Sequence, residues 1–246
     1  MENNEKVDVK KGAIIFIGET FRTGTQGTRI RGNPESYAEQ ITACKTHVKF
    51  MEDLQKKYNL EKVDAYIASY NTPYDKDLLS IYEGRLAGKQ YYPEPIGPNT
   101  LYTNTLNSIN LYDYDFILFI RIDLYLKPEF TEVFDPTINK ILFPSVLWLE
   151  NSRIHEKYPK VNDIIQFIPK KYYKHLNVFN YGDGNHDSWY LLVTQTELTI
   201  DDLDTMLKSY HDADSYKDWN PLYYVVNRPE SQIHHSKDAI FDKYTF

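Results

Sequence analysis

The stretch that decides the fold is DYDFILFIRIDLYLKP, residues 113–128. Its segment 115–120 is apolar on both faces, as expected of a central strand in a parallel sheet. The apolar run is interrupted by Arg121 and Asp123, two residues apart, and then resumes. A charged group in such a run costs free energy unless it has a partner or a function. This pair is therefore the first candidate for a functional site.

Short apolar segments alternate with amphipathic ones on both sides of this strand. Further strands are predicted for 12–17, 63–70, 141–149 and 188–193, and helices for a segment from 34–36 to about 56–62 and for 77–86, 100–111 and 199–210. Alternating strands and helices imply a mostly parallel central sheet flanked by helices. We predict one Rossmann-like α/β domain over 12–246, preceded by a disordered leader, 1–11.

The first predicted helix has a clear start and one clear face. Ser36 and Glu39 match the S-x-x-E capping box. Apolar residues then recur at steps of three and four, as in a helix with one buried face; they are Ile41, Cys44, Val48, Met51 and Leu54. Cys44, the single cysteine, is therefore predicted to be a buried apolar residue.

Composition excludes several classes of protein. The formal net charge of −7 argues against a nucleic-acid partner, because such binding depends on clustered Lys and Arg. A single cysteine allows no disulfide within the chain, which indicates a reducing compartment. No apolar run reaches the ~18 residues of a membrane span, and the polar start contains no signal-peptide core. We expect a cytoplasmic protein without a transmembrane segment.

Ligands of parallel α/β sheets bind at the carboxyl ends of the strands, and three predicted ends carry polar groups. The loop 18–34 follows the first strand and contains four glycines and three arginines. It matches neither a Walker A motif nor the G-x-G-x-x-G fingerprint. Its backbone N–H groups and guanidiniums nevertheless suit an anion such as a diphosphate. The other two ends are Ser69–Asn71 and Arg121–Asp123.

Arg121 and Asp123 point to the same side if the chain is extended. They could then meet one ligand, with the arginine on a phosphate and the aspartate on Mg²⁺ or Mn²⁺, which prefer carboxylate oxygens. Two other interpretations remain open. Asp123 could cap a helix, or it could be the ion-pair partner of Arg121.

Four segments carry a resemblance to a known family. GETFRTGTQGTRIRG (18–32), AYIASYNTPYD (65–75), DFILFIRIDLYLKPEF (115–130) and NHDSWYLL (185–192) resemble the GT-A-type nucleotide-sugar glycosyltransferases, in particular small single-domain enzymes of large DNA viruses and bacteria. The resemblance implies transfer of a sugar from a nucleotide-sugar donor to a hydroxyl of a glycan acceptor. For a viral member it implies the host cytoplasm.

The resemblance also implies roles for individual residues. The family's DxD motif falls on Arg121-Ile122-Asp123, so Asp123 is expected at the metal and diphosphate site, with Mn²⁺ or Mg²⁺ as cofactor. Arg121 stands where the first acid is expected, and an arginine could partly replace a cation's charge. The residues expected near the donor are Gly18, Arg22, Arg29, Ser69, Tyr70, Asn71, Asn104, Arg121 and Asp123. A late histidine, His234 or His235, is expected to complete the metal site.

A transferase of the inverting kind needs a base for the acceptor hydroxyl. Asp187 matches the family's late acidic residue best, and Asp163 is second. Two other functions remain open from the sequence. One is nucleotidyl transfer, and the other is a non-catalytic protein that binds a nucleotide or carbohydrate through a degenerate site.

Overall fold

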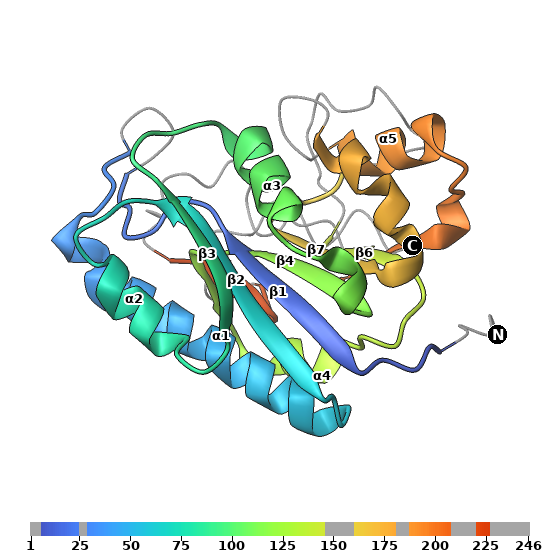
Figure 1. Ribbon diagram of the computed structural model, residues 1–246, viewed down its shortest axis with the longest axis horizontal. Coiled ribbons are helices and arrows are strands. Elements are labelled where there is room, and N and C mark those ends of the chain that lie inside the picture. The colour runs from blue at the N-terminus through green and yellow to red at the C-terminus, as the bar shows by residue number, and fades with distance from the viewer. Residues whose placement is uncertain (1–5, 25–28, 146–159, 181–186, 208–219, 227–246) are drawn as a thin grey trace, which may run out of the picture.

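The computed structural model describes residues 6–24, 29–145, 160–180, 187–207 and 220–226. Seven strands of this part form one sheet with helices on both faces (Figure 1). In spatial order they are β3 (Leu86–Tyr92), β2 (Lys62–Tyr70), β1 (Lys11–Ile17), β4 (Phe116–Arg121), β7 (Ile165–Pro169), β6 (Ile141–Phe143) and β8 (Leu203–Thr205). Strand β7 is antiparallel to its neighbours β4 and β6, and the other pairings are parallel. The predicted mostly parallel α/β sheet is confirmed.

Helices form a layer on each face of this sheet (Figure 1). One face carries α1 (Tyr37–Lys57), α2 (Asp75–Ile81) and α4 (Pro128–Val133); the other carries α3 (Pro98–Asn107), the 3-10 segment η4 (Lys170–Asn180) and α5 (Ser188–Gln195). A two-stranded sheet of β5 (Leu124–Leu126) and β9 (Tyr223–Val225) lies against α1. Among the described helices, none is both long and apolar enough to cross a membrane.

Strand β4 separates two apolar cores. Leu118 and Ile120 face the core on the α1 side, and Ile117 and Phe119 face the core on the α3 and α5 side. Both faces of β4 are therefore apolar, which explains its continuous hydrophobic run. Because side chains alternate along a strand, Arg121 continues the odd-numbered series. Its side chain emerges on the α3 side, at the carboxyl end of β4.

Helix α1 buries most of its predicted face and two polar residues besides. Cys44, Met51 and Leu54 are fully buried, as predicted, and burial raises the pKa of the Cys44 thiol to about 11. Gln40 and His47 are buried on the same face. Their hydrogen bonds, described below, explain how amide and imidazole groups are accommodated there.

The predicted capping box at Ser36 is not formed. A 3-10 turn, η1 (Pro34–Ser36), precedes α1, and Asn33 Oδ1 accepts a hydrogen bond from the backbone N–H of Glu35 at 2.9 Å. The Ser36 hydroxyl donates to the Asn33 carbonyl at 2.8 Å rather than accepting from the helix. The tighter turn supplies the helix start that the capping box was expected to provide.

Two predictions late in the chain are wrong. Residues 188–193 are not a strand but the start of α5, in which Ser188 and Leu192, four apart, are both buried. A short apolar run is compatible with the two-residue period of a strand and with the 3.6-residue period of a helix, and this run is helical. The predicted helix 199–210 begins instead with the 3-10 turn η6 (Ile200–Asp202), closed by a capping box of Thr199 and Asp202, and continues as edge strand β8. Positions 208–210 lie outside the described residues.

Several other boundaries differ from the sequence prediction. The predicted helix 77–86 is α2, which ends at Ile81, and β3 begins at Leu86. Strand β7 lies in a region predicted to be loop-rich. Of the predicted strand 141–149, only 141–143 is strand, and 146–149 lie outside the described residues. Within the predicted leader, Val9 is buried and the Val7 N–H donates to the Thr137 carbonyl at 3.0 Å.

Candidate active site

The carboxyl ends of β1, β2 and β4 lie side by side, as the strand order requires. Gly18, directly after β1, adopts φ 123°, a backbone conformation that favours glycine. Its N–H donates to the Ala68 carbonyl of β2 at 3.0 Å, and the Ile122 N–H donates to the Ile17 carbonyl at 3.0 Å. The glycine-rich loop and the Arg121–Asp123 segment are thereby held at one edge of the sheet.

Asp123 is the centre of an ion cluster at this edge. Arg121 donates to Asp123 from Nε (2.9 Å to Oδ1) and from Nη2 (2.6 Å to Oδ2). Arg22, from the loop after β1, places Nη2 3.0 Å from Oδ2. The side chains of Asp123 and Arg22 are only 4% and 8% exposed. Of the interpretations open from the sequence, the structure shows the one in which Asp123 forms an ion pair with Arg121.

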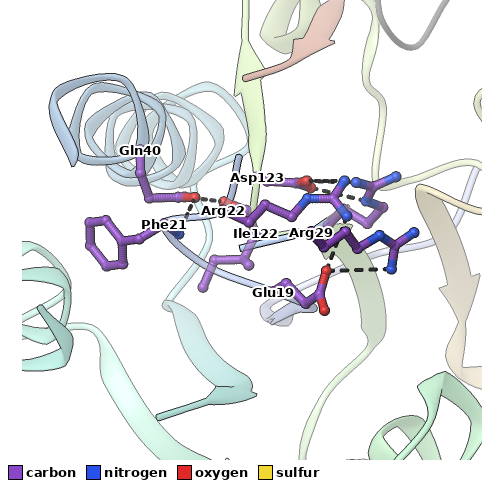
Figure 2. Close-up of polar contacts among 8 residues, drawn as sticks. Glu19, Phe21, Arg22, Arg29, Gln40, Ile122 and Asp123 are labelled. Carbon is purple, nitrogen blue, oxygen red and sulfur yellow. Dashed lines mark hydrogen bonds and ion pairs between the residues drawn. The ribbon is translucent and has the colours of Figure 1, made fainter. Parts of the chain in front are cut away.

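Glu19 extends this cluster into the glycine-rich loop. Its carboxylate lies 3.1 Å from Arg22 Nη1 and 3.4 Å from Arg29 Nη1. Figure 2 shows Asp123 facing Arg22, and Glu19 between Arg22 and Arg29. Three guanidiniums and two carboxylates leave the five groups with a formal charge of +1. Because this charge is positive, the cluster is suited to binding an anion rather than a metal cation.

Gln40 of α1 braces the two loops that carry the cluster. Its Oε1 accepts from the Phe21 N–H at 3.2 Å, and its Nε2 donates to the Ile122 carbonyl at 2.7 Å (Figure 2). Phe21 has φ 49°, an uncommon conformation for a bulky residue. Its buried ring packs against Tyr37 and Tyr74, and these two rings also contact each other.

His47, two turns further along α1, supports the segment that follows Asp123. Its Nε2 lies 2.6 Å from the Leu124 carbonyl and its Nδ1 lies 2.6 Å from the Tyr82 hydroxyl. Its ring stacks on Phe16 of β1, with centroids 4.5 Å apart. Burial lowers the pKa of His47 to about 4, so the imidazole is neutral at pH 7.

A cavity of about 340 Å³ opens on the α3 side of the cluster. Its polar lining residues are Glu19, Arg22, Arg29, Tyr70, Tyr102, Arg121, Asp163 and Gln166, and the others are Ile17, Gly18, Pro95, Gly97, Pro98, Leu101, Phe119 and Ile164. Six residues named from the sequence therefore share one cavity: Gly18, Arg22, Arg29, Tyr70, Arg121 and Asp163. A volume of this size is typical of small-molecule sites.

Four predicted donor-binding residues do not line this cavity. One is Asp123, the centre of the ion cluster, and the others are Ser69, Asn71 and Asn104. Ser69 is buried, with its hydroxyl 3.4 Å from that of Thr20. The side chain of Asn71 is exposed, and its backbone N–H donates to the Tyr92 carbonyl at 2.8 Å. Asn104 donates from Nδ2 to the Tyr92 hydroxyl at 3.1 Å. Asn71 and Asn104 thus connect the end of β2 and α3 to Tyr92 of β3.

The two candidate bases are placed differently. Asp163 lines the cavity, just before β7. Asp187 precedes α5, lies 3.5 Å from Lys160 Nζ, and is not among the lining residues. Position in the cavity thus distinguishes Asp163 from Asp187, the residue that the sequence favours as base. His234 and His235 lie outside the described residues.

The side chains around Asp123 do not suit a divalent cation. Both carboxylate oxygens already accept hydrogen bonds from guanidinium groups, whose charge repels a metal ion at this position. In the part of the chain that the structure describes, no group of three or more His, Cys, Asp or Glu side chains is arranged to hold a metal ion. The expectation of Asp123 as a metal ligand therefore does not fit the arrangement of these side chains.

Sequence reasoning missed Glu19, Gln40 and Gln166. Gln166 interrupts the otherwise apolar segment 164–168, as Arg121 and Asp123 interrupt theirs. The same signal that identified the Arg121–Asp123 pair could have identified Gln166. Gln40 follows Glu39 among other polar residues, so this signal does not mark it. Glu19, between Gly18 and the arginines, carries no comparable signal in the sequence.

Comparison with known proteins yields similarity of fold only. No protein-family model matches the chain, and no curated protein matches it in sequence. Matching solved structures include a glycosyltransferase involved in glycosylation of the major capsid of PBCV-1 (10% identity, TM-score 0.40, 84% of this chain and 82% of that one). The catalytic domain of Drosophila β1,4-galactosyltransferase 7 matches at 12% identity with a TM-score of 0.46, over 95% and 77% of the two chains. The inositol-1-phosphate CTP transferase of T. maritima matches at 11% identity with a TM-score of 0.45, over 81% and 86%. The structural neighbours thus include glycosyltransferases and nucleotidyltransferases.

Proposed function

We propose that this protein is a glycosyltransferase that moves a sugar from a nucleotide-diphosphate sugar to a hydroxyl of a glycan acceptor. One observation carries the proposal: Arg22, Arg29 and Arg121 converge on a cavity at the carboxyl ends of β1, β2 and β4. Such an edge is where α/β sheets bind ligands. A diphosphate is the part of the donor that three guanidiniums would recognise.

The arginines also supply the chemistry that the leaving group requires. Negative charge develops on the diphosphate as the bond to the sugar breaks, and preorganised positive groups stabilise that charge. Arg121 and Arg22 are held in place by Asp123, so little reorganisation is needed when the charge appears. In this proposal the guanidiniums have the role that the sequence resemblance assigned to Mn²⁺ or Mg²⁺.

Tyr70 is the proposed platform for the nucleoside. It lies at the carboxyl end of β2 and lines the cavity. The guanidinium of Arg31 lies 5.2 Å from the centroid of its ring, which supports the ring from outside the cavity. An aromatic face at this position suits stacking of a nucleobase.

Asp163 is the proposed base. Its position in the cavity wall, beside Ile164 and near the carboxyl end of β4, supports this role, because we expect the acceptor hydroxyl to approach the donor from this side. A carboxylate within hydrogen-bond reach of that hydroxyl takes its proton as the new bond forms. Asp187 is the alternative drawn from the family resemblance.

A ligand screen with product analysis tests the proposal. UDP, GDP, TDP, CMP and their sugar conjugates are added to the intact chain, and the melting temperature is followed, because a ligand of the native state raises it. We expect a rise with one nucleoside diphosphate and its sugar conjugate, and release of the diphosphate when an acceptor glycan is supplied. Release of pyrophosphate from a nucleoside triphosphate would instead indicate nucleotidyl transfer. No response to any of these compounds would overturn the proposal.

A further inference from the structure

Gln166 lines the cavity and carries a buried hydrogen-bond donor that has no partner among the described residues. It is the second residue of β7, is 1% exposed, and lines the cavity. Its Oε1 accepts a long hydrogen bond from the Tyr102 hydroxyl, at 3.5 Å. Its Nε2 has no hydrogen-bond partner among the described residues. A buried amide donor without a partner costs free energy, so its presence needs a reason.

Its position distinguishes Gln166 from the other unpaired buried groups. In the described part of the chain, other residues with a buried side-chain atom that makes no hydrogen bond include Arg31, Tyr91, Ser145, Trp189 and Asn220. None of those residues lines the cavity. Gln166 is thus where an unsatisfied donor and a ligand-sized cavity coincide.

The strand order shows which part of a ligand would reach Gln166. Gln166 of β7 is paired with Phe119 of β4. Phe119 lies two residues before Arg121, so the two side chains are on the same face of β4. Strand β7 lies on the far side of β4 from β1 and β2, whose ends carry Gly18 and Tyr70. A donor with its nucleoside at Tyr70 and its diphosphate at Arg121 would therefore extend its sugar toward β7.

The surroundings of Gln166 suit a sugar ring. Phe119 and Tyr102 stack with centroids 4.2 Å apart at an angle of 25°, and both line the cavity. Aromatic side chains suit the apolar C–H face of a pyranose, while a buried amide selects a hydroxyl at one position. A site built to hydrogen-bond a substrate hydroxyl strongly rejects the analogue that lacks it.

We propose that Gln166 is a specificity-determining residue, which donates a hydrogen bond from Nε2 to a hydroxyl oxygen of the transferred sugar. This inference rests on the proposed function, because it assumes that the cavity holds a nucleotide-diphosphate sugar. It goes further by assigning the β7 side of the cavity to the sugar. It also names the group that distinguishes one sugar from another.

The test compares two ligands across three variants. Affinities for the nucleoside diphosphate and for its sugar conjugate are measured by calorimetry with wild type, Gln166→Leu and Gln166→Glu. We expect either substitution to weaken binding of the sugar conjugate about tenfold and to leave the bare diphosphate within about twofold. Gln55→Leu, near the end of α1 and outside the cavity lining, is the matched control and should change neither affinity.

A second measurement identifies the hydroxyl. Donors deoxygenated at single sugar positions are bound to wild type and to Gln166→Leu, and the two losses form a double-mutant cycle. One deoxy donor should bind wild type about tenfold more weakly than the parent donor does. The same deoxy donor and the parent donor should bind Gln166→Leu with equal affinity. Melting temperatures of all variants separate loss of fold from loss of contact.

Three results would overturn the inference. Equal weakening of the diphosphate and its sugar conjugate would place Gln166 at the nucleotide. Unchanged affinity for both in either folded variant would make Gln166 a structural residue. Failure of wild type to bind any nucleoside diphosphate would instead remove the proposed function, and with it the basis of this inference.

Discussion

The guanidinium of Arg121 donates two hydrogen bonds to the carboxylate of Asp123, at 2.9 and 2.6 Å. The sequence predicts that these two residues contact one ligand, and in the structure they form an ion pair with each other. Arg22 shares the same carboxylate from a loop about a hundred positions earlier. The consequences of this arrangement for binding, stability and metal dependence can be measured separately.

Replacing Arg121 should weaken binding of the nucleoside diphosphate. Arg121→Ala removes one guanidinium and exposes the carboxylate of Asp123 to the phosphates, so we expect affinity to fall about 10- to 100-fold. Arg121→Lys should recover only part of this, because an ammonium lacks the planar fork. Calorimetry measures the effect, with Lys49→Ala on the exposed face of α1 as the charge-matched control. Equal affinities in Arg121→Ala and the control would place the diphosphate elsewhere.

Removing the carboxylate of Asp123 should cost stability. Asp123→Ala removes one of the two carboxylates beside the buried Arg22, the other being Glu19, and we expect the free energy of unfolding to fall by about 3 kcal/mol. Urea denaturation provides the measurement. Asp53→Ala, which breaks the exposed pair of Asp53 with Lys49, should change stability by about 0.5 kcal/mol or less. A loss no larger than in this control would show that the cluster does not stabilise the fold.

Binding of the diphosphate should be nearly independent of divalent cations. Because guanidiniums occupy both oxygens of Asp123, we expect affinities in EDTA and in Mn²⁺ to agree within about threefold. Calorimetry in the two buffers measures this. A large gain in affinity with Mn²⁺ that disappears in Asp123→Asn would restore Asp123 as a metal ligand.

Asp163 and Asp187 should differ in their effect on turnover. Asp163→Asn should lower kcat about 100-fold or more, because the base is lost, while donor affinity stays within about threefold. Asp187→Asn makes the same chemical change outside the cavity lining and should leave kcat within about twofold. Initial rates with a saturating donor decide the point. The opposite pattern would return the base to Asp187.

The stability of the fold should fall in mild acid because of His47. Its pKa is about 4 in the folded chain and ordinarily 6.5, so the unfolded state binds a proton more readily. This contribution is fully present above pH 6.5 and is lost progressively as the pH falls from 6.5 to 4. Between pH 7 and 5 we expect a loss of about 2 kcal/mol from this group. Urea denaturation at both pH values should show a smaller loss in His47→Gln, and equal losses would assign the effect to other groups.

Much of the fold was predictable because its signals are local. The apolar runs that form β1, β2 and β4, and the periodic face of α1, reflect burial by immediate neighbours on a sheet or helix. Predictions failed where an apolar segment was short, as in 188–193, or where a strand needs a distant partner, as β7 needs β4 and β6. Such pairing depends on residues far along the chain and leaves little trace in the segment itself.

The sequence by itself determined that charged residues end the central strand, and that arginines and glycines follow the first. Only the tertiary structure decided what those groups do. Gln40 brings two loops together, Arg22 reaches Asp123, and Gln166 lies beside Phe119 in the cavity. The physical reason is that hydrogen bonds and ion pairs act over a few ångströms, whatever the separation along the chain. Composition and spacing identify the groups, but packing selects their partners.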